Sequence, residues 1–167
     1  MEIRREWAMP NKNTFDIKPI REFIERHARG VILDPFANRN RLATITNDIN
    51  PEYGTDFCMD ALDFLRSRPK NSADTVLFDP PFSQRQIAES YKSVGMAVNM
   101  ETTQSSYWKN LKEQIARIVK EGGGAITCAW NSGGIGEKYG FRIEEILLVP
   151  HGGWHNDTIV VYERKVR

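Results

Sequence analysis

The residues with the clearest chemical potential are the four consecutive positions Asp79-Pro80-Pro81-Phe82. Proline has a fixed φ and no backbone N–H, so the pair forms a rigid turn whose carbonyls are free to accept hydrogen bonds. The Asp79 side chain and the Pro80 carbonyl are suited to accept the two N–H bonds of an exocyclic amine on a base. The Phe82 ring is suited to stack on that base. The protein would then act by positioning the amine and by accepting developing positive charge; a purely structural turn is the alternative.

Carboxylates recur where the predicted strands end. Asp34, Asp48 and Asp79 each close an apolar run, and Asp60 follows a shorter one. In open α/β sheets, ligands bind beyond the carboxyl ends of the strands, where a carboxylate can accept hydrogen bonds from ribose. We assign ribose to Asp48 and the adenine amino group to Asp60. An acidic rim repels phosphate and suits an adenosine with a cationic substituent, as in S-adenosylmethionine. No GxGxxG or GxxxxGK[ST] loop is present, which argues against nicotinamide dinucleotides and ATP.

Short apolar runs alternate with helical patterns along the chain. This alternation predicts an α/β fold with a doubly wound, mostly parallel, seven-stranded sheet that has an antiparallel edge. Helices are expected over 20–29, 60–67, 84–92 and 106–123, the last ended by the glycines at 122–124. Strands are expected over 31–35, 43–49, 57–59, 75–79, 124–130, 141–150 and 157–164.

Length and composition limit the organisation. The 167 residues predict a single domain over 1–167, with a polar arm over 1–14 and no separate target-recognition domain. The net charge of +1 neither requires nor excludes a nucleic-acid partner. We expect no membrane association, because no apolar run approaches the roughly 20 residues that span a bilayer. The two cysteines, Cys58 and Cys128, are expected to be free thiols in the cytoplasm.

The quoted residues resemble the S-adenosylmethionine-dependent DNA amino-methyltransferases of the N6-adenine and N4-cytosine group. The segment FDPPF at 78–82 is similar to their catalytic motif, VILDPFA at 31–37 to their cofactor motif, and the Lys-Pro segment at 17–27 to one that precedes it in one subclass. The resemblance implies a Rossmann-like class I methyltransferase fold, and the aspartate form of the motif favours adenine N6. The cofactor residues that it implies are Phe15, Lys18, Pro19, Asp34, Pro35, Phe36, Asn38, Asp48, Asp60 and Ala61.

The chain departs from the family pattern in the loop that follows the cofactor strand. The family continues there with glycine, whereas this chain has Asn38-Arg39-Asn40-Arg41. Asparagine visits left-handed backbone angles more readily than most residues, so Asn38 can partly replace glycine. Without a recognition domain, strict sequence specificity would require a homodimer or another partner.

Two further segments are candidates for substrate contact. The loop PHGGWHND at 150–157 joins the last two strands. Trp154, His151 and His155 are candidates for stacking on the base and Asn156 for a hydrogen bond to it; a plain hairpin is the alternative. No third ligand accompanies its histidines, so we expect no metal. Residues 83–107 are predicted to form a mobile lid, in which Ser83, Arg85, Tyr91 and Lys92 are candidates for contacting a nucleic-acid backbone; a flexible connector without a function is the alternative.

These features together predict methyl transfer from S-adenosylmethionine to N6 of adenine in DNA. The same chemistry on RNA adenine or on cytosine N4 remains open. A catalytically silent, methyltransferase-like binding subunit is the alternative from another class, and methylation of a small-molecule or protein amine is a third.

Overall fold

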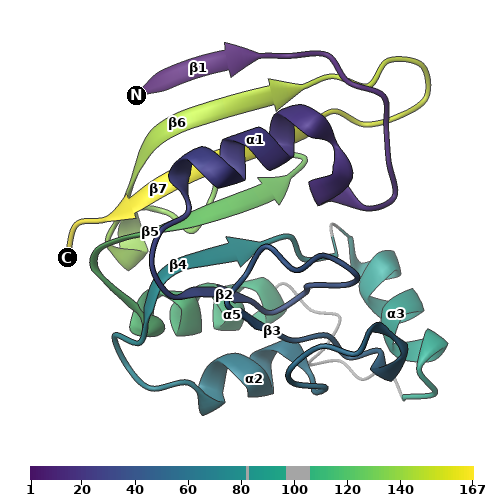
Figure 1. The fold of residues 1–167 in the computed structure, drawn as a ribbon, viewed down its shortest axis with the longest axis vertical. Coiled ribbons are helices and arrows are strands. Elements are labelled where there is room, and N and C mark those ends of the chain that lie inside the picture. The colour runs from purple at the N-terminus through teal and green to yellow at the C-terminus, as the bar shows by residue number, and fades with distance from the viewer. Residues whose placement is uncertain (82, 97–105) are drawn as a thin grey trace.

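The computed structural model describes residues 1–81, 83–96 and 106–167, and its core is a mixed β-sheet (Figure 1). The described residues form seven strands in the order β1-β6-β7-β5-β4-β2-β3. β7 runs antiparallel to both of its neighbours, and all other neighbouring pairs are parallel. The strands are β1 (Glu2–Arg5), β2 (Ile32–Asp34), β3 (Ile45–Thr46), β4 (Ala73–Phe78), β5 (Val119–Ala129), β6 (Phe141–Val149) and β7 (Thr158–Lys165).

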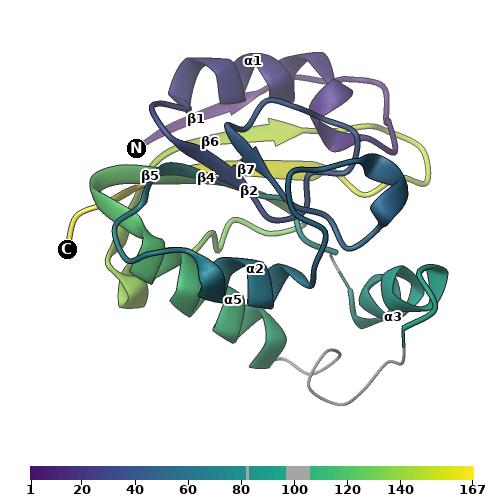
Figure 2. The same cartoon turned by 60° about the horizontal axis from the view of Figure 1, so that its bottom comes forward.

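The helices form a layer on each face of the sheet, as the turned view shows (Figure 2). α1 lies on one face and α2 and α5 on the other, while α3 lies at the end where β2 and β4 finish. The α-helices are α1 (Lys18–His27), α2 (Ala61–Ser67), α3 (Gln84–Ser93) and α5 (Ser106–Ile118). The short 3-10 helices are η1 (Thr14–Asp16), η2 (Pro51–Tyr53) and η3 (Glu137–Tyr139).

Two hydrophobic clusters hold these layers together. Ile20, Phe23 and Ile24 share one face of α1, at the helical spacing read from the sequence, and pack on the sheet. On the opposite face, α5 contributes Leu111 and Ile115, which are fully buried. The clusters fix the strands, and the strands in turn fix the loops that follow them.

The predicted fold class and the antiparallel pairing of the last two strands are confirmed, but one strand is predicted in the wrong segment. The expected strand at 57–59 is reduced to a single parallel bridge between Asn47 and Phe57. The seventh strand is instead β1, inside the segment expected to be a polar arm. Its side chains are mostly charged, and the strand forms because its backbone pairs in parallel with β6, from Glu2 opposite Glu145 to Arg5 opposite Leu148.

The end of the long helix also differs from the prediction. α5 stops at Ile118, and β5 begins at once with Val119 opposite Ala73. The glycines that were expected to end the helix instead let the strand pass close to its neighbours. Gly122 has a φ of +79°, and a Cβ on Gly123 would lie 2.7 Å from the Asp74 carbonyl oxygen. The described part of the chain includes no helix that is both long and apolar enough to cross a membrane.

Candidate functional site

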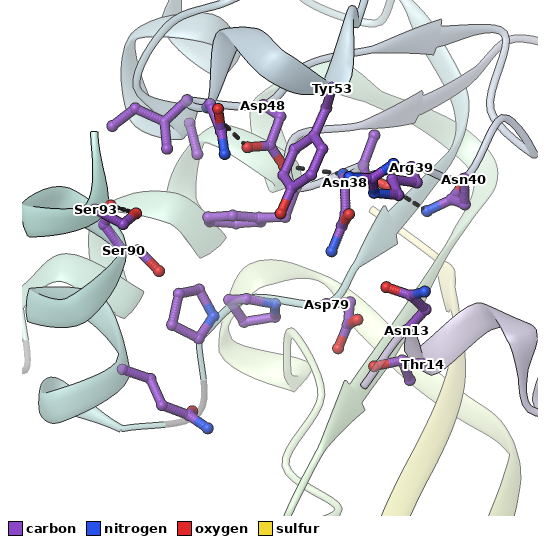
Figure 3. A pocket seen from close by; sticks show the side chains of 18 of the residues that line it. Asn13, Thr14, Asn38, Arg39, Asn40, Asp48, Tyr53, Asp79, Ser90 and Ser93 are labelled. Carbon is purple, nitrogen blue, oxygen red and sulfur yellow. Dashed lines mark hydrogen bonds between the residues drawn. The ribbon is translucent and has the colours of Figure 1, made fainter. Parts of the chain in front are cut away.

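A cavity of about 660 Å³ lies at the carboxyl ends of β2, β3 and β4 (Figure 3). Its wall combines the segment around η1, the loops after β2, β3 and β4, the start of α2 and one side of α3. The described lining includes five carboxylates and two cations, so it carries net negative charge. The carboxylates are Asp16, Asp48, Asp60, Asp79 and Glu89, and the cations are Lys12 and Arg39.

Asp34 shapes the loop after β2 from beneath. Its side chain is fully buried, and its Oδ1 accepts a hydrogen bond from the Phe36 backbone N–H at 3.0 Å. Its Oδ2 lies 3.3 Å from the Asn40 amide nitrogen. Burial raises the pKa of Asp34 to about 7, because a buried carboxyl resists ionisation. Asp34 does not line the cavity. Its hydrogen bonds hold the loop from which Phe36 and Asn38 line the cavity.

Asp48 ties this loop to the one after β3. Its Oδ2 accepts from the Asn38 backbone N–H and its Oδ1 from that of Asn50, both at 2.9 Å. Burial raises its pKa, and the backbone hydrogen bonds from Asn50 and Asn38 oppose that rise. The φ of Asn38 is 52°, which confirms the expected left-handed conformation. Figure 3 shows the Asn38 side chain directed towards the cavity, and its buried Oδ1 has no hydrogen-bond partner among the described residues.

Asp60 links the start of α2 to α3. Its Oδ1 caps the helix by accepting from the Leu62 and Asp63 backbone N–H groups at 2.9 and 3.4 Å. Its Oδ2 accepts a hydrogen bond from the Tyr91 hydroxyl of α3. Burial raises the pKa of Asp60, and burial followed by the nearby Asp60 charge raises the pKa of Tyr107. The carboxylate predicted to contact adenine therefore also anchors α3 to the cavity wall.

We expect Tyr91→Phe to destabilise the fold, because it removes the hydrogen bond that anchors α3. Tyr91 is 5% exposed, and a hydrogen bond to a charged group contributes about 1.5–3 kcal/mol. Urea unfolding should show a loss of that size in the free energy of unfolding. Tyr53→Phe is the matched control, since the Tyr53 hydroxyl faces the same cavity without a hydrogen bond to any described residue. Equal effects of the two substitutions would contradict the anchoring role.

Asp79 follows β4 and faces the cavity from the side of the sheet. Figure 3 shows its carboxylate beside Asn13 and Thr14. Burial raises its pKa to about 7, and a side-chain hydrogen bond with Thr14 opposes the rise. Pro80 and Pro81 line the cavity next to it. The turn thus brings one carboxyl group with a perturbed pKa to the same cavity as Asp48; Phe82 lies outside the described residues.

Several predicted site residues lie elsewhere. Lys18 is exposed, with its Nζ 3.8 Å from Glu22 Oε1, and Pro19 lies in the first turn of α1. Pro35 lies beneath the loop, where its carbonyl accepts a hydrogen bond from the Asn47 amide at 3.2 Å. Of the predicted cofactor residues, those that line the cavity are Phe15, Phe36, Asn38, Asp48, Asp60 and Ala61.

The loop 150–157 lies on the expected edge of the sheet but not on the cavity. Trp154, His155 and Asn156 are exposed and do not belong to its described lining. His151 is buried, and its ring nitrogens lie 2.8 Å from the Ala8 carbonyl oxygen and from Thr158 Oγ1. These bonds hold the loop against the N-terminal segment, away from the cavity.

Sequence reasoning did not identify two parts of the wall. Asn13 and Thr14 lie at the start of η1, in the segment expected to be a polar arm, and were therefore not assigned to the site. In α3, which falls in the predicted lid, Ser90 lines the cavity together with Tyr91, which was expected to contact a nucleic-acid backbone instead. Arg85 is paired with Glu89 at 2.8 Å. The apolar residue Ile87, buried four positions before Tyr91, was the available signal that this helix packs against the fold.

No family model and no curated protein matches this sequence. Several solved structures share its fold. TrmN from Thermus thermophilus is 14% identical with a TM-score of 0.56, covering 89% of this chain and 48% of its own. This chain thus spans about half the length of TrmN.

Two further matches cover more of both chains. 1,6-Didemethyltoxoflavin-N1-methyltransferase from Burkholderia thailandensis has a TM-score of 0.59 at 12% identity, covering 90% of this chain and 78% of its own. N-methyltransferase NodS from Bradyrhizobium japonicum has a TM-score of 0.56 at 12% identity, covering 94% of this chain and 90% of its own. The fold is therefore the Rossmann-like fold of S-adenosylmethionine-dependent methyltransferases.

Proposed function

We propose that this protein transfers a methyl group from S-adenosylmethionine to N6 of adenine in nucleic acid, with DNA as the first candidate substrate. The observation that carries the proposal is that the Asp79-Pro80-Pro81 turn and the carboxylates of Asp48 and Asp60 line one cavity. A methyl donor and an acceptor amine must meet in such a shared space.

The cavity has features that suit this cofactor. Its volume of about 660 Å³ falls within the range of about 300–1,000 Å³ typical of small-molecule sites. The net negative lining favours a ligand that carries sulfonium and ammonium charges. The buried Asn38 Oδ1, without a partner among the described residues, is an acceptor that a ligand N–H or O–H would satisfy. Two of the structures that share the fold were solved with S-adenosylhomocysteine, the product of such a transfer.

Each residue has a defined task in the proposed reaction. Asp48 accepts hydrogen bonds from the ribose and Asp60 from the adenine amino group of the cofactor. When bound, S-adenosylmethionine supplies a methyl group on a cationic sulfur, which keeps the bonding electron pair as the amine nitrogen attacks. Asp79 and the Pro80 carbonyl hold the two N–H groups of the target amine. Asp79 then stabilises the positive charge on the nitrogen and accepts the proton that it releases.

The exocyclic amine requires this positioning because its lone pair is delocalised into the base. It is therefore a weak nucleophile, and a base inside a duplex must also leave the stack to reach the cavity. The Asp79 carboxyl, with its pKa of about 7, is suited to accept a proton near neutral pH. Cytosine N4 presents the same amine chemistry and stays an alternative target.

The direct test is transfer of labelled methyl from S-adenosylmethionine to matched oligonucleotides. We expect label in an adenine-containing DNA strand and none in the same strand with adenine replaced by thymine. A matched RNA strand distinguishes the nucleic acids, and a strand with cytosine as its amine-bearing base tests N4. Absence of label in the adenine-containing DNA, the RNA and the cytosine-containing strand would reject the proposed activity.

The departure in the loop after β2 favours one second candidate, a catalytically silent binding subunit. Arg41 donates hydrogen bonds to the Asn38 and Asn40 carbonyl oxygens at 3.0 and 2.7 Å, which closes the loop on itself. Calorimetry with S-adenosylmethionine separates the two candidates, because a silent subunit of this kind need not bind it. Binding that is weakened by Asp48→Ala would support the enzyme, and no binding would support the silent subunit.

A further inference from the structure

The first nine residues expose one side of their extended backbone. Odd-numbered side chains are exposed and even-numbered ones from Arg4 onward are half-buried, which is the period of a strand. On the inner side, Arg4 bonds Glu6 at 2.8 Å and approaches Glu145. The outer side carries Met1, Ile3, Trp7 and Met9, which are 58–78% exposed.

A second exposed indole ring is carried by the β6–β7 loop, which contacts the segment that holds Trp7. Trp154 is fully exposed at the tip of the β6–β7 loop. The Trp7 indole nitrogen lies only 3.6 Å from where a Cβ on Gly152 would be. Ala8 donates its backbone N–H to the Pro150 carbonyl oxygen at 3.2 Å, and His151 bonds the Ala8 carbonyl oxygen. These contacts join the two segments. The exposed surface that carries the Trp7 and Trp154 rings is called the Trp7–Trp154 surface.

This surface lies at the same end of the sheet as the cavity. Figure 1 shows the β6–β7 loop and the segment after β1 at the end where β2 and β4 finish. The chain runs from Trp7 to Lys12, which lines the cavity. Five residues span at most about 17 Å. A strand with one base in the cavity would therefore reach the Trp7–Trp154 surface within a few nucleotides.

Electrostatics favours stacking over phosphate contact as the source of affinity. The net charge is +1 and the cavity lining is acidic. Counterion release from a duplex would therefore contribute little to the binding affinity of this protein. Aromatic stacking does not depend on charge and tolerates any base sequence. Arg5 is exposed on the same side of the strand as Trp7, and Lys12 lines the cavity. Neither has a carboxylate within 4.0 Å among the described residues, so both are suited to a few backbone phosphates.

We infer that the Trp7–Trp154 surface stacks on unpaired bases next to the target nucleotide, so that the substrate is single-stranded or locally unpaired nucleic acid. This inference rests on the proposed function for the identity of the target. It also gives Trp154 a role outside the cavity and adds Trp7, which sequence analysis did not select. A large exposed apolar surface on a folded chain commonly marks an interaction site.

The test measures binding of a fluorescently labelled 12-nucleotide thymine strand with one central adenine, in the presence of S-adenosylhomocysteine. We expect Trp7→Ala and Trp154→Ala each to weaken binding by roughly five-fold to a hundred-fold, the range for loss of one stacked ring. Phe in place of either Trp should largely retain affinity. Val166→Ala, at an exposed apolar residue near the C-terminus, is the control. Affinity should depend weakly on salt, and the matching duplex should bind less tightly.

Two outcomes would overturn the inference: unchanged strand affinity in both Ala variants, or tighter binding of the duplex with a steep salt dependence. In the first case, loss of self-association in the Ala variants, measured by sedimentation velocity, would identify the surface as a contact between copies of the chain. These measurements need no methyl transfer, so they can refute the stacking surface without refuting the proposed activity. The labelled-methyl assay tests the activity independently of the surface.

Discussion

Asp79→Ala is expected to lower kcat for methyl transfer by at least about a hundred-fold, the usual cost of removing one group that stabilises developing charge. The variant loses both the acceptor that orients the amine and the base that takes its proton. Because Asp79 lies on the opposite side of the cavity from the Asp48 loop, cofactor affinity should change little. Single-turnover transfer of labelled methyl measures the first quantity, and calorimetry measures the second.

Asp79→Asn separates the two roles of this carboxyl group. Its carbonyl oxygen can still accept one N–H, but it neither carries negative charge nor accepts a proton. We expect it to remain far below the wild type, which would assign most of the loss to charge. Asp63→Asn removes a carboxylate from α2 outside the cavity, where the side chain is 67% exposed, and serves as the control. Full transfer activity in Asp79→Ala with intact cofactor binding would refute the assignment.

The sequence predicted which acids lie at the cavity edge better than it predicted what each one contacts. β2 and β4 were found as apolar runs that end in Asp34 and just before Asp79. Yet Asp34 turns inward under its loop while Asp79 faces the cavity. That difference depends on where the following backbone N–H groups point, and this is decided by the three-dimensional path of the loop.

Long-range pairing explains the other differences. Three of the four side chains of β1 are charged, and only pairing with the edge of β6 makes it a strand. Likewise, α5 ends at Ile118 because Val119 finds a partner in Ala73, although the helical pattern continues beyond it. Asn38 was predictable because its left-handed φ is a local property of asparagine. Local rules therefore succeeded where the conformation depended on adjacent residues and failed where it depended on a partner strand far along the chain.

The free energy of unfolding is expected to fall as pH rises from about 4 to about 7. Asp34 and Asp79 have pKa values of about 7 in the fold, against 3.8 ordinarily, because burial disfavours their charged forms. Between these values the native state binds more protons than the unfolded chain, so raising the pH favours unfolding. A tenfold change in an acid constant corresponds to about 1.4 kcal/mol, which makes the effect of each group on the order of a few kcal/mol. Urea unfolding at pH 4 and pH 8 measures it.

Other titrating groups must be separated from this effect. The pKa of His27 is lowered by burial, so His27 contributes in the opposite direction near its ordinary value of 6.5. Asp79→Asn isolates the contribution of one group, because the substitution removes a titrating carboxyl and leaves His27 in place. We expect this variant to be more stable than the wild type at pH 8, with a much smaller difference at pH 4. An equal difference at the two pH values would mean that Asp79 titrates normally in the fold. If the expectation holds, the variant gains stability only at high pH and loses methyl transfer. That combination would mean that burying the Asp79 carboxyl destabilises the fold and that its catalytic role explains why it is there.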